Sequence, residues 1–173
     1  MKTAPPGAAQ RDVNFPFLRT GDVAFAARVP RKILLEWFDR GQVSLIPEDH
    51  ASSGTGENRR LTLRTAYRIA IIADLYRLGL PVRKGAVIAA KFADHGNPGR
   101  DPGRLYDARY PTYLLALGSA DTAECCPHGP MTASGAPASL SYNCEYAVTA
   151  VHAGLGIEAD PPGYQYPPEA DDE

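Results

Sequence analysis

Positively charged side chains that could bind phosphate are concentrated in the first half of this 173-residue chain. Residues 17–91 hold 13 Lys and Arg against 7 Asp and Glu, whereas the rest of the chain holds 5 basic and 13 acidic residues. The net charge of −2 therefore hides a basic block between acidic flanks. Because a polyanion responds to local rather than net charge, this distribution favours a partner that carries phosphates.

Side chains suited to metal chemistry occur together only near the middle of the second half. Cys125, Cys126, His128 and Cys144 offer four soft ligands, the number that tetrahedral zinc requires. Their spacing is poor for zinc, because adjacent cysteines seldom bind one ion and no C-x₂-C pair exists. We therefore expect reduced thiols and no bound metal, with metal or thiol sensing as the alternative.

Motifs for catalysis are not visible. His50, His95 and His152 are isolated in the sequence, and there is no Ser-His-Asp order, phosphate-binding loop or HExxH motif. We expect no enzymatic activity and no cofactor.

The basic residues lie on segments with helical periodicity. Thr20 is suited to cap a first helix, and Pro30 to begin a second that ends before Gly41. Two helices joined by so short a turn predict a helix-turn-helix, whose second helix can enter the DNA major groove, about 12 Å wide. In that second helix Leu34, Trp37 and Phe38 form the core stripe. The opposite face carries Arg31, Lys32, Glu36 and Arg40.

A basic hairpin is expected to follow these two helices. Residues 43–46 and 59–61 favour short strands on either side of a loop rich in Gly and Ser at 52–58, which together make a wing ending in Arg59 and Arg60. Thr62 then caps a third helix, on which Arg64 and Arg68 share one face. Gly79 ends this helix, and a fourth runs from Pro81 to about Phe92.

The C-terminal half predicts a strand at 112–117, a second at 131–133 and a helix at 139–155. This region is too small to bury a hydrophobic core alone. It must therefore pack either on the N-terminal helical module, residues 17–93, or on a second copy of the chain. We favour the second copy. The remaining segments are a flexible arm at 1–16, a linker at 94–111 and a disordered acidic tail at 158–173.

The first module resembles the DNA-binding domain of MerR-type regulators and the related excisionase-like winged helices. The resemblance covers about residues 18–92, through GDVAFAARVP, the Trp of EWFDRG, and RRLT opening a helix that ends in LGLPV. It implies a homodimer and DNA contacts at Arg31, Lys32, Arg59, Arg60 and Arg64. The chain departs from the family at Ile33, Leu35 and Glu36, which weakens base recognition, and it lacks the long coiled-coil helix.

These observations predict a mainly α fold, with a winged helix-turn-helix at 17–93 and a small α+β dimerisation region at 112–157. The expected function is transcriptional regulation through double-stranded DNA. An architectural, excisionase-like protein and a protein-interaction adaptor remain alternatives. No apolar run approaches the roughly 20 residues of a membrane span, and the N-terminus lacks a signal-peptide apolar stretch. We therefore expect a cytoplasmic, nucleoid-associated protein without a membrane partner.

Overall fold

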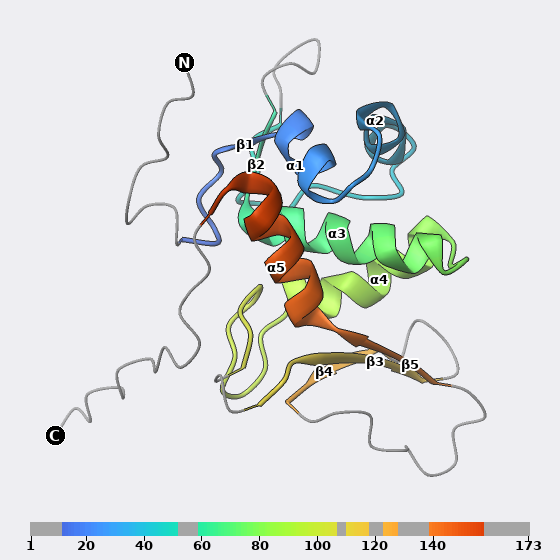
Figure 1. The fold of residues 1–173 in the computed structure, drawn as a ribbon, viewed down its shortest axis with the longest axis vertical. Helices are drawn as coiled ribbons and strands as arrows, with labels where there is room; N and C mark the ends of the chain where they lie inside the picture. Colours follow the sequence, from blue (N-terminus) through green and yellow to red (C-terminus); the bar gives the residue numbers. More distant parts are fainter. Residues whose placement is uncertain (1–11, 52–58, 107–109, 118–122, 128–138, 158–173) are drawn as a thin grey trace, which may run out of the picture.

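The computed structural model describes residues 12–51, 59–106, 110–117, 123–127 and 139–157. Within these ranges the chain is a mixed α/β protein with five helices and two small antiparallel sheets (Figure 1). Helices α1 (Thr20–Ala26) and α2 (Arg31–Asp39) lie at one end and a three-stranded sheet at the other, with α3 (Leu63–Arg77) between them. No helix in the described ranges is long and apolar enough to cross a membrane.

The first two helices begin and end close to the predicted residues. Helix α1 begins one residue earlier than predicted: Arg19, and not Thr20, is the N-cap, and its backbone N–H donates to Asp22 Oδ2 at 2.9 Å. Helix α2 follows Pro30, and Gly41 adopts a φ of +61° directly after its C-cap, as predicted. Only glycine enters this left-handed region without steric cost, so the second helix ends there.

A short sheet joins the beginning of the chain to the start of α3. Strand β1 (Leu18–Arg19), which the sequence analysis did not predict, pairs antiparallel with β2 (Arg60–Leu61). Arg60 also forms an antiparallel bridge with His50 on its other side. The strand predicted at 43–46 is wrong, because this segment forms no ladder, and the predicted loop at 52–58 lies outside the described residues.

Helix α3 is the centre of the fold. The Thr62 side chain accepts the N–H of Thr65 at 3.2 Å, which confirms the predicted cap, and Gly79 follows the helix at a φ of +94°. Every residue from 63 to 73 is buried. Helix α4 (Val82–Ala93) begins after Pro81, as predicted, and packs along α3.

The C-terminal part contains a sheet in the order β4-β3-β5. Strand β3 (Tyr113–Leu117) confirms the predicted strand, and β4 (Glu124–Cys126) occupies a segment that was expected to be loop. The predicted helix start at Ser139 is wrong: residues Ser139–Asn143 form β5, and α5 (Cys144–Leu155) begins only afterwards. Pairing with β3 overrides the helical pattern of these five residues. The strand predicted at 131–133 lies outside the described residues.

The apolar stripe of α5 is covered by the same chain and not by a second copy, which corrects the favoured prediction. Helix α5 packs against α1 and α3 and crosses over α3 (Figure 1). The approach to α1 is so close that a Cβ on Gly154 would lie 2.7 Å from Ala26 Cα. Tyr142 Oη donates to Asp74 Oδ2 at 2.6 Å, and burial together with this carboxylate raises the pKa of Tyr142.

The segment predicted as a linker packs against the end of α4. Arg100 is 5% exposed, and its guanidinium donates to the backbone oxygens of Lys91, Phe92 and His95. Because the last carbonyls of a helix lack partners within that helix, a buried cation at this position satisfies them. Arg100, together with the backbone hydrogen bond from Gly103 N–H to the Phe92 carbonyl, therefore holds this segment against the end of α4.

Gly154→Val tests the packing of α5 on α1. We expect a loss of about 1–3 kcal/mol in the free energy of unfolding, because the added methyl groups enter space that the Ala26 backbone occupies. The matched variant is Ala153→Val, at the exposed neighbouring position, for which helix propensity alone predicts less than about 1 kcal/mol. Urea unfolding of both variants provides the measurement, and equal effects would contradict this packing.

Candidate nucleic-acid interface

Arg19 and Arg60 lie directly opposite each other in the two-stranded sheet. Their Cα atoms are partners in the antiparallel register, and the neighbouring pair, Leu18 and Leu61, is buried. Successive side chains of a strand point to opposite faces, so the two arginines share the outer face. Like charges placed directly opposite each other destabilise a sheet unless an anion lies between or above them.

The strand that carries Arg60 is positioned by a buried carboxylate. Asp49 is 7% exposed and accepts three hydrogen bonds, from the N–H of Ile46 at 3.1 Å, the N–H of Thr62 at 2.8 Å and Thr65 Oγ1 at 2.6 Å. These contacts attach the segment before His50 to the beginning of α3. The orientation of β2, the strand that carries Arg60, is therefore set by its attachment to α3.

Arg59 connects the same segment to α2. Its guanidinium carbon lies 4.7 Å from the centroid of the Phe38 ring, and its Nε and Nη1 have no hydrogen-bond partner among the described residues. Both of these nitrogens are buried, so the contact with the ring shields part of the charged group from water. The wing residue predicted to contact phosphate thus lies beside the C-terminal end of α2.

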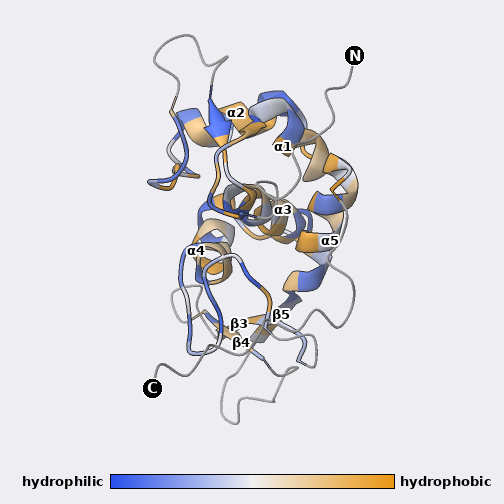
Figure 2. Cartoon of the chain, turned by 90° about the vertical axis from the view of Figure 1, so that its left-hand side faces the viewer, coloured by the Kyte–Doolittle hydropathy of each residue, from blue (hydrophilic) through white to orange (hydrophobic). Residues whose placement is uncertain are grey.

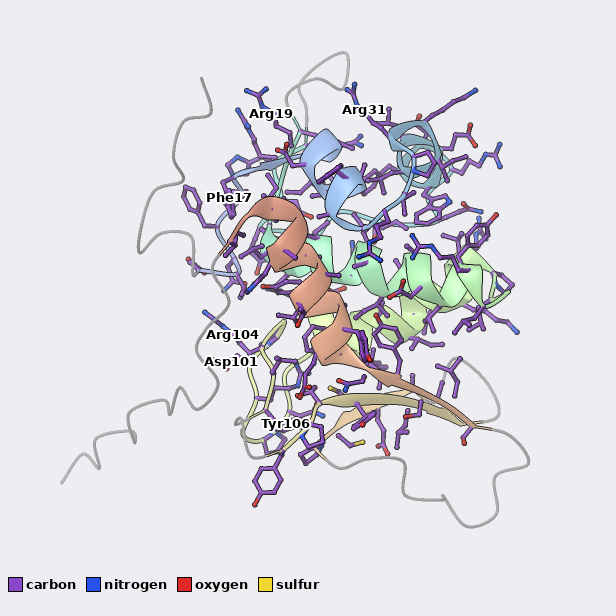
Figure 3. All side chains as sticks on the ribbon, viewed as in Figure 1. Phe17, Arg19, Arg31, Asp101, Arg104 and Tyr106 are labelled. Atoms are coloured by element: carbon purple, nitrogen blue, oxygen red, sulfur yellow. The ribbon has the colours of Figure 1, made fainter. Side chains whose placement is uncertain are left out.

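Helix α2 presents further charges at this end of the molecule. Arg31 and Lys32 are exposed in its first turn, where the helix dipole is also positive. Figure 3 shows Arg19 and Arg31 at the same end, directed away from α3. Arg40 lies 3.8 Å from Glu36, and both side chains are well exposed, so this ion pair is weak. Figure 2 shows hydrophilic residues on β2 and on parts of α1 and α2 here.

Arg64 does not belong to this surface, which corrects the sequence prediction. It is 7% exposed: Nε donates to the Ala93 carbonyl at 2.8 Å, and Nη1 donates to Asn14 Oδ1 at 2.9 Å and to Glu48 Oε1 at 3.0 Å. With these partners its guanidinium cannot reach a phosphate. It acts instead as an internal support that links α3 with the end of α4 and with two loops.

Arg19 is the surface residue that the sequence analysis missed. The sequence signal was a basic residue directly before the first helix. Only the pairing of β1 with β2 places this residue beside Arg60. That pairing joins residues about forty positions apart in the chain. We define the basic end as Arg19, Arg31, Lys32, Arg40, Arg59 and Arg60.

The cysteines form a separate cluster beside β3. Cys125 and Cys144 are buried and carry free thiols that are hydrogen-bonded to each other. This hydrogen bond lowers the pKa of Cys125, whereas burial raises the pKa of Cys144. His128 lies outside the described residues. Among the residues that are described, no group of three or more His, Cys, Asp or Glu is arranged to hold a metal ion.

The sequence matches no known protein-family model and no curated protein. The cations of the basic end, of which only Arg40 is ion-paired among the described residues, can attract a polyanion.

The variants Arg64→Met and Arg60→Met distinguish the structural role of Arg64 from the surface role of Arg60. We expect Arg64→Met to lower the free energy of unfolding by about 3 kcal/mol, because it removes one buried and two partly buried hydrogen bonds and leaves the buried Ala93 carbonyl without this donor. Arg60→Met should change it by no more than about 0.5 kcal/mol. Urea unfolding monitored by circular dichroism measures both, and a small effect at Arg64 would restore that residue to the surface site.

Proposed function

We propose that this chain binds double-stranded DNA through its basic end, as a MerR-like winged helix-turn-helix transcriptional regulator. In this proposal α2 enters the major groove, and the hairpin around His50 and Arg60 is the wing that follows the adjacent backbone. The observation that supports this proposal most directly is the position of Arg19 opposite Arg60 in the two-stranded sheet. This sheet lies at the same end of the molecule as the first turn of α2.

The electrostatics of this pair support a phosphate partner. Two guanidinium groups on opposed strand positions repel each other in the free protein. A phosphate group that accepts hydrogen bonds from both would remove this repulsion and release counterions from the DNA. The affinity gained in this way does not depend on the base sequence.

The composition of α2 supports a larger share of backbone contacts than of base contacts. Arg31 and Lys32 can donate to guanine or to phosphate from the first turn. Further along, Ile33 and Leu35 are partly exposed apolar side chains, and Glu36 is paired with Arg40. Base reading would then be concentrated at the N-terminal end of the helix, with Glu36 suited to a cytosine amino group.

A homodimer is part of the proposal, because two recognition helices about 34 Å apart would read successive turns of DNA. The stripe on α5 is not available for dimerisation. Leu78 at the end of α3 and Val87 on α4 are instead 72% and 41% exposed, and they are apolar candidates for an interface. Light scattering of the full chain tests this state, and a monomer bound to one half-site would remove the dimer from the proposal.

The salt dependence of binding tests the phosphate contacts. We expect Arg19→Ala and Arg60→Ala each to reduce the slope of log K against log salt by about 0.9, on specific and random DNA alike. The matched control is Arg83→Ala, which removes an exposed arginine from α4, away from the basic end. Fluorescence anisotropy over a salt series measures the slopes. Unchanged slopes for both variants would refute the proposed wing.

Lys32→Ala tests base reading by α2. Loss of one base contact should cost about 1–3 kcal/mol on selected DNA and much less on random DNA, since only the selected site offers the lost partner. Site selection on genomic fragments followed by anisotropy provides the comparison. Equal losses on both kinds of DNA would assign Lys32 to the backbone.

The adaptor alternative is favoured by one observation, the partly exposed apolar side chain of Leu35 next to the ion-paired Glu36 on α2. A partly exposed apolar side chain on a helix can pack against a protein partner. Absence of any mobility shift at low salt, where phosphate contacts are strongest, would favour the adaptor over the DNA-binding protein.

A further inference from the structure

A cleft of about 320 Å³ lies between α2, α3 and the turn that joins α1 to α2. Its apolar walls are formed by Val29, Ile33, Trp37 and Tyr76, and Arg28 and Arg77 stand among its lining residues. The volume is at the lower end of the range for small-molecule sites, about 300–1,000 Å³. An apolar cleft with a few polar groups is the usual composition of such sites.

Two aromatic rings shape the inner wall. Trp37 and Tyr76 meet edge to face, with centroids 5.8 Å apart and an interplanar angle of 73°. Trp37 is 5% exposed, whereas Tyr76 is 53% exposed, so Tyr76 leaves much of its surface in contact with solvent. A third ring could pack here in the offset or edge-on arrangements that aromatic groups prefer.

The two arginines of the cleft differ in how far their charge is compensated. Arg77 donates to Asp74 Oδ1 at 2.6 Å and to the carbonyls of Ala27 at 3.1 Å and Arg28 at 2.7 Å. Arg28 is exposed, and its guanidinium has no acceptor in the part of the chain that the structure describes. The lining of the cleft therefore includes a cation that is free to pair with an anion.

The backbone of Arg28 gives a second reason to assign it a role. Its φ is +54°, and it is the one residue other than glycine with a positive φ in the described ranges. A residue with a Cβ is strained in this conformation, for which glycine is the ordinary choice. Strained residues of this kind cluster at functional sites, and here hydrogen bonds of the turn, from Arg28 N–H to the Phe25 carbonyl and from Arg77 to the Arg28 carbonyl, hold the residue in this conformation.

We propose that this cleft binds a small aromatic carboxylate. The ring lies against Ile33, Trp37 and Tyr76, and the carboxylate pairs with the Arg28 guanidinium. A neutral aromatic compound would use the walls but leave the cation unpaired, and an aliphatic anion would lose the ring contacts. The combination of both features selects the ligand class.

A ligand in this cleft would contact the turn and the inner side of α2, the helix that we propose to enter DNA. Regulation of DNA binding by the ligand therefore rests on the proposed function, whereas binding of the ligand does not. The chain contains one tryptophan, Trp37, so its indole N–H gives a single resonance that reports on the cleft without DNA.

Titration of the ¹⁵N-labelled full chain with 3-phenylpropionate tests the site. We expect a saturable shift of the indole resonance below about 10 mM ligand, and at least about fivefold weaker binding of the uncharged 3-phenylpropanamide. Arg28→Gln should lower the affinity for the carboxylate about fivefold and leave that for the amide unchanged. Arg83→Gln, the matched loss of an exposed arginine on α4, should alter neither.

Tyr76→Ala should weaken binding about threefold through the lost ring contact, whereas Tyr146→Ala, at an exposed tyrosine on α5, should not. An indole resonance that does not move with 3-phenylpropionate would overturn the site. Equal affinities for acid and amide, or for wild type and Arg28→Gln, would overturn its assignment to carboxylates. A chain that fails to bind DNA but shows the indole shift would lose the proposed function and keep the ligand site.

Discussion

Helix α3 is enclosed on all sides over residues 63–73, and two of these buried residues are arginines. A buried guanidinium is tolerated only when its hydrogen bonds and its charge find partners. Arg64 and Arg68 therefore determine where several other segments lie. Arg68 donates to Asp94 Oδ2 at 2.7 Å and to the Ser44 carbonyl, and Arg64 reaches the Ala93 carbonyl. The end of α4 and the loop after α2 are both held by this requirement.

The basic block of the sequence consequently contains two kinds of arginine. Arg64 and Arg68 compensate internal acceptors and contribute little to the outer field, and Arg100 in the following segment does the same for the end of α4. The residues of the basic end keep their charges toward solvent or on the face of an aromatic ring. A count of charges along the chain overstates the surface charge for this reason. Of the other cations in the block, six form the basic end, and five lie outside it: Arg28, Arg77, Arg83, Lys84 and Lys91.

The basic end and the aromatic cleft share α2 but use different sides of it. Its first turn carries Arg31 and Lys32, whereas Ile33 and Trp37 line the cleft against α3. A change in how α2 rests on α3 would alter both surfaces at once. Such coupling requires a ligand that binds one arrangement of α2 better than another. The turn at Arg28 is the point where the two surfaces meet.

Helix boundaries near Pro30, Gly41, Thr62, Gly79 and Pro81 followed from the sequence alone, because caps and turns depend on residues within a few positions of each other. The same is true of β3, bounded by its own flanking residues. Local patterns did not reveal the pairing of Arg19 with Arg60, the burial of Arg64 or the strand at Ser139–Asn143. Each of these depends on partners that are distant in the chain. A long cationic side chain can face water or an internal acceptor with the same local sequence, and only the tertiary structure decides which.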